Sequence, residues 1–391
     1  MINSLSDLAF DGRRVFLRSD LNVPLKDGKV ADDSRIQASL PTLKALLDGG
    51  AHVVLASHLG RPKGEVNPKY SLEPVGAYLA EMLDIEVKLT DKPVGDAARQ
   101  VVSELKSGEI ALLENLRFNR GEEANDEGFA KDLAKLCDVY VNDAFGAAHR
   151  KHASVYALAQ LIPERAAGLL LEKELEALSK LRSNPEKPYV AVLGGAKVSD
   201  KIKVIEALLD KVDALIIGGA MANTFLAAQG KPMGKSLMET EKLAMARSVL
   251  SRAEEKGVKL MLPVDLVIAD SIEASDARVV PVDAVPNDAM ALDVGPQSMR
   301  NFSPVLLAAK TVFWNGPMGL FEKPAFSQGT MSMAKAIADC KGLTVVGGGD
   351  SLAAAKQSGL SEHFSHLSTG GGASLEFLEG CTLPGVQALE L

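Results

Sequence analysis

Short apolar runs rich in Val, Ile and Leu recur along this chain, and each ends in glycine or polar residues before a longer helical pattern begins. This alternation constrains the fold more than any other feature of the sequence, because it is typical of α/β proteins. The runs are nearly continuous in apolar residues, as strands buried on both faces of a parallel sheet require. They lie at residues 14–17, 52–55, 110–113, 139–141, 189–193, 214–217, 259–262, 311–314 and 344–346. The pattern predicts an α/β fold with two doubly wound parallel-sheet, Rossmann-like domains joined by a hinge helix.

The length of 391 residues is too great for one ordinary hydrophobic core and fits two domains. A helical pattern over 169–182 leads into Pro185, and the residue before a proline disfavours helix, so we predict a connecting helix there. The expected boundary is near residue 185. The expected parts are an N-terminal domain at 1–170, the connecting helix at 171–185, a C-terminal domain at 186–370, and a segment at 371–391 that returns to the N-terminal domain.

The composition excludes several classes of partner. A net charge of −8 argues against non-specific nucleic-acid binding, which depends on clustered Lys and Arg. Cys137, Cys340 and Cys381 are isolated from one another, which fits a reducing compartment. The N-terminus has no basic segment followed by an apolar run, and no stretch is apolar enough to span a membrane. We therefore expect a cytoplasmic protein without nucleic-acid or membrane partners.

Cationic side chains follow the apolar runs of the first half. The segments at 18–24, 57–62, 114–118 and 142–150 each contain Arg or His, and Arg35 lies shortly after the first. Because ligands bind at the carboxyl ends of parallel strands, these residues predict a local anion site on an acidic protein. One such arginine alone is as often an ordinary surface residue. Asp20 and Asn22 add groups suited to a hydroxyl, so a small hydroxylated phosphate ester is the expected ligand.

Glycine clusters follow the apolar runs of the second half, at 194–195, 218–219, 316–319, 347–349 and 370–372. Glycine lets backbone N–H groups approach phosphate oxygens closely, so the clusters predict a nucleotide site. Lys197 and Lys201, four residues apart at the start of a helical pattern, are expected on one helix face toward the phosphates. Asp350 is placed to hold Mg²⁺ on those phosphates or to cap a helix, and the two roles are compatible.

Other familiar fingerprints are missing. The sequence contains no G-x-x-x-x-G-K-[ST] and no G-x-G-x-x-G after an apolar run, which disfavours a dinucleotide site. The histidine pairs His149/His152 and His363/His366 have a spacing that zinc sites use, but no Cys or third ligand lies nearby in the sequence. An NAD-dependent dehydrogenase and a catalytically silent nucleotide-binding protein of the same fold remain as alternatives.

Seven motifs, in order along the chain, carry a resemblance to a known family. They lie at residues 18–24, 57–62, 113–118, 194–201, 314–319, 347–350 and 369–372. Over essentially its full length the chain resembles the phosphoglycerate kinase family. The resemblance implies a reversible phosphoryl transfer from 1,3-bisphosphoglycerate to Mg-ADP, giving 3-phosphoglycerate and ATP, in glycolysis and gluconeogenesis.

The resemblance also implies site residues. Those expected to bind 3-phosphoglycerate are Asp20, Leu21, Asn22, Arg35, His58, Leu59, Gly60, Arg61, Arg117 and Arg150. Those expected to bind the nucleotide are Gly194, Gly195, Lys197, Lys201, Gly218, Gly219, Asn315, Pro317, Glu322, Gly348, Gly349, Asp350 and Ser351. Asp350 is the expected Mg²⁺ ligand. Ser351 is a departure, since Thr is usual there, but the hydroxyl is kept.

We expect direct transfer without a phosphoenzyme, by a monomer. The residues expected at the transferring group are Arg35, Lys197, Gly371 and Gly372. Because the two ligands would bind on different domains, domain closure is expected to be part of the cycle.

Overall fold

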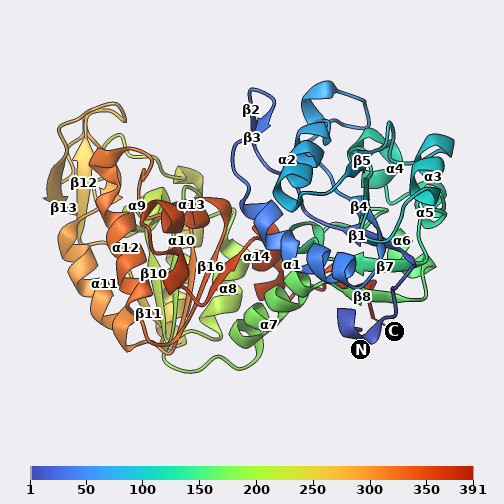
Figure 1. The fold of residues 1–391 in the computed structure, drawn as a ribbon. Coiled ribbons are helices and arrows are strands. Elements are labelled where there is room, and N and C mark those ends of the chain that lie inside the picture. Colours follow the sequence, from blue (N-terminus) through green and yellow to red (C-terminus); the bar gives the residue numbers. More distant parts are fainter. Residues whose placement is uncertain (1, 391) are drawn as a thin grey trace. The chain divides into compact units, whose positions relative to one another are not determined.

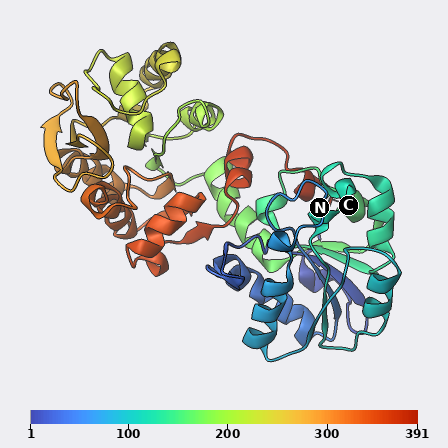
Figure 2. The same ribbon diagram turned by 90° about the horizontal axis from the view of Figure 1, so that it is seen from above.

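The computed structural model describes residues 2–390, which divide into two compact units. Unit 1 contains residues 2–176 and 382–390, and unit 2 contains residues 177–381. The division falls inside helix α7 (Leu169–Ser183). The chain returns to unit 1 at Thr382, later than the expected residue 371. Near the two ends of the chain, Ile2 and Glu390 form an antiparallel bridge, and Figures 1 and 2 both show these ends side by side.

Unit 1 is built on a six-stranded parallel sheet with the order β5-β6-β4-β1-β7-β8. Its strands are β1 (Arg14–Arg18), β4 (His52–Ala56), β5 (Val87–Leu89), β6 (Ile110–Leu112), β7 (Val139–Asn142) and β8 (Arg165–Ala167). The four strands predicted from apolar runs are confirmed. The sequence prediction missed β5 and β8, because Val87-Lys88-Leu89 and Arg165-Ala166-Ala167 contain no continuous run of Val, Ile or Leu.

The core of unit 1 lies between this sheet and its covering helices. Alternate strand residues, such as Leu17 and Leu55, pack in one cluster with Leu43 and Leu79 of the helices. The helices are α1 (Ser34–Asp48), α2 (Glu73–Leu83), α3 (Asp96–Ser103), α4 (Arg120–Glu123), α5 (Glu127–Ala134), α6 (Ala157–Leu161) and α15 (Pro384–Gln387). A small hairpin joins β2 (Leu25–Lys26) to β3 (Lys29–Val30). Alternate residues of a strand face opposite sides of the sheet, and both sides are covered. Each predicted strand is therefore apolar along its whole length.

Unit 2 contains a second six-stranded parallel sheet, with the order β11-β10-β9-β15-β16-β17. Its strands are β9 (Tyr189–Leu193), β10 (Ala214–Ile217), β11 (Lys259–Met261), β15 (Thr311–Asn315), β16 (Leu343–Gly347) and β17 (His366–Ser368). The five predicted strands are confirmed, and β17 was missed. An antiparallel sheet of β12 (Asp265–Ala269), β13 (Arg278–Pro281) and β14 (Met290–Val294) was also not predicted. The predicted doubly wound α/β class is confirmed for both units.

Helices cover the sheet of unit 2. They include α8 (Ile202–Leu209), α9 (Gly219–Ala228), α10 (Leu243–Glu255), α11 (Pro296–Ala308), α12 (Gln328–Ala338), α13 (Gly349–Gln357) and α14 (Gly372–Leu378). The fully buried Trp314 of β15 packs in one cluster with Phe302 of α11 and Met333 of α12. This cluster fixes the strands whose ends carry the glycine motifs.

The strand order of unit 2 creates a crevice. From β9 the chain proceeds outward through β10 and β11, and it later returns to β15 on the other side of β9. Loops after β9 and β15 therefore leave the sheet in opposite directions and open a crevice between them, where ligands bind in folds of this kind. In unit 1, β1 occupies the corresponding central place between β4 and β7.

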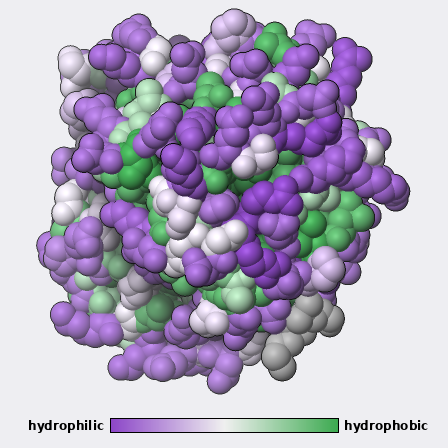
Figure 3. Space-filling model, turned by 45° about the vertical axis from the view of Figure 1, so that its right-hand side comes forward, coloured by the Kyte–Doolittle hydropathy of each residue, from purple (hydrophilic) through white to green (hydrophobic). Residues whose placement is uncertain are grey.

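The surface visible in Figure 3 is dominated by hydrophilic residues, with small hydrophobic patches scattered among them. Within residues 2–390, every helix is too short or too polar to cross a lipid bilayer.

Candidate active site

The end of β1 carries the first group of predicted site residues. An Arg35 Nη1 donates to Asp20 Oδ2 over 2.6 Å, and the Asp20 side chain is 9% exposed against 36% for Arg35. Asp20 thus holds one terminal nitrogen of the Arg35 guanidinium, while the arginine side chain stays partly open to solvent. This arrangement presents a fixed cation at the sheet edge.

Three further predicted residues meet after β4. Asn22 Oδ1 accepts the Gly60 N–H over 2.8 Å, and Arg117 Nη1 donates to the Gly60 carbonyl over 2.8 Å. Gly60 has φ of +59°, which favours glycine, and a Cβ there would meet the Tyr70 ring at 2.4 Å. The loops after β1, β4 and β6 are therefore tied to one another through Gly60.

Positive charge is concentrated at this edge. Burial lowers the pKa of Arg117, and the nearby Arg18 and Arg150 cations lower it further, while Glu123 opposes the shift. Burial also lowers the pKa of His58 well below 6.5, again with help from arginines. The local potential is therefore positive on a protein of net charge −8, which favours an anionic ligand.

The remaining predicted residues of unit 1 differ in exposure. Arg61 is exposed and Arg150 is half-buried, so both have surface to offer a ligand. Leu21 and Leu59 are buried, and their N–H groups already donate, to Ser57 Oγ over 2.9 Å and to Asn115 Oδ1 over 3.3 Å. The side chains of these two leucines pack in the interior, and their N–H groups hold the loops in place.

The glycine loops of unit 2 interlock through backbone atoms. The Gly195 N–H donates to Pro317 O over 3.0 Å, and the Gly219 N–H donates to Met318 O over 3.0 Å. A Cβ at Gly194 would lie 2.1 Å from Pro317 O. These contacts bring the loops after β9, β10 and β15 close together, which requires small residues there whether or not a ligand is bound. Gly218 is the N-cap of α9.

The two lysines do not share a helix face, and that part of the prediction is wrong. Helix α8 begins at Ile202 with Lys201 as its N-cap, so Lys197 lies in the preceding loop. The physical reason is Glu239, which accepts hydrogen bonds from both the N–H and the Oγ of Ser199, at 3.0 and 2.5 Å, and holds the segment out of the helix. Lys197 is exposed.

The ammonium of Lys201 is held at the carboxyl ends of two strands. It donates to Gly194 O over 2.7 Å and to Asn315 O over 2.9 Å. Burial lowers its pKa to about 8, while the carboxylates of Asp350 and Asp200 oppose this shift. Lys201 is thus a cation with a perturbed pKa at the crevice between β9 and β15.

Helix α13 brings the triple-glycine motif to the same crevice. Its N-cap is Gly348, with φ of +95°, so the alternative that Asp350 caps the helix is wrong. Asp350 lies exposed in the first turn. Asn315 Nδ2 donates to Gly347 O over 2.8 Å, and Ser351 Oγ accepts the Gly316 N–H over 2.5 Å. These two side chains join the loops to each other.

A cavity of about 430 Å³ opens over these loops. Predicted residues that line it are Gly195, Gly219, Pro317, Glu322 and Asp350. Sequence reasoning missed Asn223, Lys235 and Asp293, which also line it. Asp293 is buried, and burial raises its pKa to about 7, although it accepts the N–H groups of Gly329 and Val294. Asn223 lies inside α9, Lys235 in a loop and Asp293 in β14, so none of the three stands directly at the end of a strand of the main sheet, which was the signal used.

Gly371 and Gly372 lie at the start of α14. Gly371 is the N-cap with φ of +51°, a value that favours glycine, and Gly372 is exposed. Their N–H groups stand where the predicted role needs them, at a helix N-terminus, and the role itself stays a prediction.

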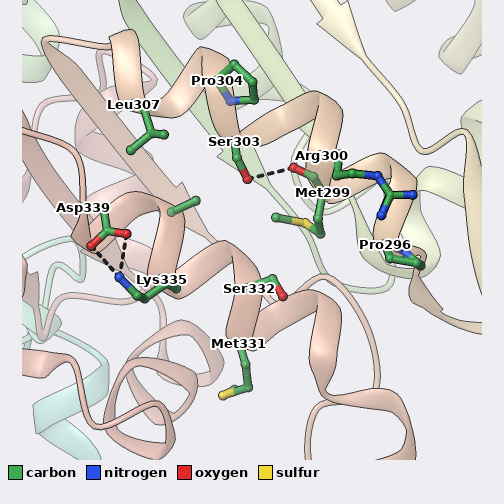
Figure 4. Close-up of a pocket in the computed structure, with 11 residues that line it drawn as sticks. Pro296, Met299, Arg300, Ser303, Pro304, Leu307, Met331, Ser332, Lys335 and Asp339 are labelled. Atoms are coloured by element: carbon green, nitrogen blue, oxygen red, sulfur yellow. Dashed lines mark hydrogen bonds and ion pairs between the residues drawn. The ribbon is translucent and has the colours of Figure 1, made fainter.

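A second hollow, of about 670 Å³, lies between α11 and α12 (Figure 4). None of the predicted site residues lines it. Several of its polar groups are already engaged, since Ser303 Oγ donates to Met299 O over 2.7 Å and Lys335 Nζ donates to both Asp339 oxygens, at 2.7 and 2.6 Å. Arg300 donates to Gln297 Oε1. The crevice is therefore the better candidate in unit 2.

An arginine-lined sheet edge in one unit and a glycine-lined crevice with a lysine and an aspartate in the other define a two-unit α/β phosphotransferase. A family model described as phosphoglycerate kinase matches residues 5–381. The chain belongs to the phosphoglycerate kinase family.

Curated relatives and solved structures agree with this assignment. The chain is 54% identical over 387 residues to a phosphoglycerate kinase of Moorella thermoacetica, covering 99% of this chain and 98% of the relative. It is 53% identical over 393 residues to that of Anaeromyxobacter dehalogenans, covering 100% and 99%. The phosphoglycerate kinase structure from Coxiella burnetii matches with a TM-score of 0.89 at 44% identity, covering 100% and 99%. That from Pyrococcus horikoshii matches with a TM-score of 0.89 at 36% identity, covering 100% and 98%.

Proposed function

We propose that the protein transfers a phosphoryl group reversibly between 1,3-bisphosphoglycerate and Mg-ADP, giving 3-phosphoglycerate and ATP. The observation that carries this proposal is that the seven motifs of the family lie at the carboxyl ends of two separate parallel sheets, arginines on one and glycines on the other. Each edge has the chemistry of one of the two ligands.

Unit 1 would bind 3-phosphoglycerate. Arg117 and Arg61 offer guanidinium groups suited to phosphate, and the Asp20 and Asn22 pair offers acceptors and a donor for the hydroxyl. Arg35 would reach the reacting carboxyl end, because Asp20 fixes it while part of its fork stays open. His58 and Arg150 complete the proposed set with Leu21, Leu59 and Gly60, which would shape the loops.

Unit 2 would bind the nucleotide in the crevice between β9 and β15. The Gly194–Gly195 and Gly218–Gly219 loops give a flat backbone surface for the base and ribose. Lys201, Asn315, Pro317, Glu322 and the turn at 348–351 would surround the phosphates. The size of the cavity, about 430 Å³, is within the range of small-molecule sites.

The donor set fits magnesium delivered with the nucleotide. Within residues 2–390, no three His, Cys, Asp or Glu side chains come together as a metal site, so the protein alone would not hold the ion. One exposed carboxylate, Asp350, stands at the crevice, and Mg²⁺ commonly takes one or two carboxylates together with substrate phosphates. When bound there, the ion would neutralise phosphate charge.

The proposed chemistry is direct transfer, in which the protein positions the two oxygens and stabilises charge on the moving group. Lys197, Arg35 and the backbone N–H groups of Gly371 and Gly372 would donate to that group. Because one ligand would bind each unit, we propose that closure of the units brings the ligands together and expels water.

We further propose that the protein acts as a cytoplasmic monomer without nucleic-acid or membrane partners. The net charge of −8 and the three isolated cysteines, of which Cys137 and Cys340 are buried, support this.

A coupled assay for ATP formation from ADP and 1,3-bisphosphoglycerate, with purified protein, tests the function. We expect turnover that requires Mg²⁺. Binding of both ligands without ATP formation would favour the silent nucleotide-binding alternative. Reduction of NAD with a hydroxy acid would favour the dehydrogenase alternative.

A further inference from the structure

Arg18 is the one arginine of the substrate motifs whose side chain is fully buried. It is the last residue of β1, and its Nε donates to Ser154 Oγ over 2.8 Å while Nη1 donates to the Ser19 carbonyl. Its Nη2 lies 3.3 Å from His58 Nδ1. A side chain without solvent exposure cannot contact a ligand at the sheet edge, so Arg18 has no role in the proposed function as described above.

Arg18 belongs to a buried cluster with a balancing charge. The Glu122 side chain is also fully buried, and its Oε1 lies 4.0 Å from Arg18 Nη2. Ser154 bridges the two, because its Oγ donates to Glu122 Oε1 over 2.6 Å and its N–H donates to Oε2 over 2.9 Å. Burying such a pair is expensive in desolvation and adds little to stability. We call Arg18, Glu122 and Ser154 the Arg18 cluster.

The geometry fixes the direction of the contact with His58. A guanidinium has N–H donors and no acceptor, and it keeps its proton in proteins. The Nδ1 of His58 must therefore accept, and a neutral imidazole with an accepting Nδ1 carries its proton on Nε2, on the side of the ring away from Arg18. We infer that Arg18 is a positioning residue that holds His58 as the neutral Nε2–H tautomer, ready to donate a hydrogen bond to an oxygen of the phosphoglycerate anion. This inference rests on the proposed function.

The surroundings of the ring support a neutral form. Burial lowers the pKa of His58 well below 6.5, and nearby cations lower it further. The charged and titratable groups around the ring are Arg18 of β1, Arg35 of α1, Arg117 after β6 and His152 after β7. Glu122 of α4 lies beyond Arg18, where it accepts a hydrogen bond from Ser154 and pairs with Arg18. Burial lowers the pKa of His152 itself to about 3, so it is neutral as well. The donor should therefore be neutral at neutral pH and above.

A neutral donor differs in function from an imidazolium. A neutral imidazole donates a directional hydrogen bond without adding positive charge, which the arginines of the edge already supply. It also leaves a single N–H for the ligand, which selects an accepting oxygen at that place. The Arg18 cluster thereby converts a residue that usually titrates near neutral pH into a fixed donor.

Ring ¹⁵N NMR of the full-length wild-type protein without ligand tests the tautomer directly. A His58→Gln variant identifies the His58 signals. We expect the spectrum of the Nε2–H tautomer at neutral pH and above. An Nδ1–H tautomer, or titration of His58 near 6.5, would overturn the inference.

A charge-balanced double variant, Arg18→Met with Glu122→Gln, tests the positioning role. It removes the donor to Nδ1 without leaving Glu122 as an unpaired buried charge. We expect His58 to exchange between tautomers and 3-phosphoglycerate affinity, measured by calorimetry, to fall roughly ten- to hundredfold. ADP affinity should be unchanged. The same tautomer with unchanged 3-phosphoglycerate affinity would contradict the inference.

The matched control removes an ion pair at the other end of the same strand. Arg14→Met with Asp138→Asn eliminates a contact of 2.6 Å at the amino end of β1 and should leave both the His58 spectrum and 3-phosphoglycerate affinity unchanged. If the Arg18 variant fails to fold, the wild-type NMR result still decides the tautomer. If the wild-type protein binds no 3-phosphoglycerate, the proposed function is wrong. The NMR experiment still determines the tautomer of His58, because it is done without ligand.

Discussion

The two sheet edges are constructed by different means. In unit 1 the edge consists of side chains that are already held by other groups of the unit, as Arg35 is by the Asp20 carboxylate and Arg117 is by the Gly60 carbonyl. In unit 2 the edge consists mainly of backbone, with Gly194 close to Gly316 and Gly219 close to Gly195. Arginine side chains held in fixed positions are suited to bind a small rigid anion. Exposed backbone N–H groups of glycine-rich loops are suited to bind a flat base with a phosphate chain.

The difference has a consequence for mutation. When one arginine of a side-chain edge is truncated, specific contacts to the ligand are lost. The affinity for the ligand of that unit should fall, and the affinity for the other ligand should not change. A backbone edge tolerates little added volume, and under the proposed function it would depend on only a few charges, chiefly those of Lys197 and Lys201. The largest effects should therefore come from charges that meet the moving phosphoryl group.

Lys197→Ala should give the largest loss. Removing one preorganised charge from a transition state costs roughly 10²- to 10³-fold in kcat. The melting temperature should not change, because Lys197 is exposed. Lys203→Ala, at another exposed lysine of the same region, is the control and should leave kcat unchanged. If kcat of Lys197→Ala stays within about threefold of wild type, Lys197 has no catalytic role and is an ordinary solvated lysine.

Arg35→Ala should lower kcat by roughly 10²-fold while ADP affinity, measured by calorimetry, stays unchanged. The reason is that Arg35 belongs to unit 1 and would contact only the substrate and the transferring group. Arg14→Ala is a close control, since its ion pair has the same length of 2.6 Å and its side chain is 35% exposed against 36%. A large loss of ADP affinity would show that Arg35 is assigned to the wrong ligand.

Arg61→Ala and Arg117→Ala should each weaken 3-phosphoglycerate binding by roughly tenfold or more, the usual cost of a hydrogen bond to a charged group. Only Arg117→Ala should also lower the melting temperature, because Arg117 is buried and supports Gly60 O. Added salt should weaken wild-type binding in the same direction. Arg120→Ala, at a side chain 78% exposed, is the control. Unchanged affinity in both variants would mean that the arginine edge is ordinary surface.

The smallest effect should be a pH dependence of ADP affinity. Lys201, with a pKa of about 8, is charged below that pH and loses its charge above it. Wild-type ADP affinity should therefore fall by up to roughly tenfold between pH 8 and 9, and Lys201→Arg should remove this dependence because arginine stays charged. A flat wild-type profile would contradict a phosphate contact by Lys201.

The same lysine has a signed effect on stability. Burial lowers its folded-state pKa from 10.5 to about 8, so the unfolded chain binds more protons between these values. Its contribution to the free energy of unfolding should therefore increase as the pH rises through that window. Denaturant titrations of wild type and Lys201→Met across the window measure this contribution.

The main strands and the placing of the motifs could be predicted from the sequence. Nine strands were located because a buried parallel strand is apolar along its whole length, a local signal that needs no partner. Strands β5, β8 and β17 were missed because each has a polar residue within its three positions and so no continuous apolar run, and the antiparallel sheet around β12 was missed as well. Asp293 and Lys235 were missed at the cavity because they follow no strand of the main sheet.

The sequence by itself determined the fold class, the family and the strand ends where cationic and glycine motifs gather, because these depend on residue type and order along the chain. Only the tertiary structure decided what each polar group binds. Asn315 binds Gly347 O, Lys201 binds two strand-end carbonyls, and Arg18 is buried against Glu122. Most of these partners are far apart in sequence, and a buried polar group takes whichever partner the packed strands bring within hydrogen-bonding distance.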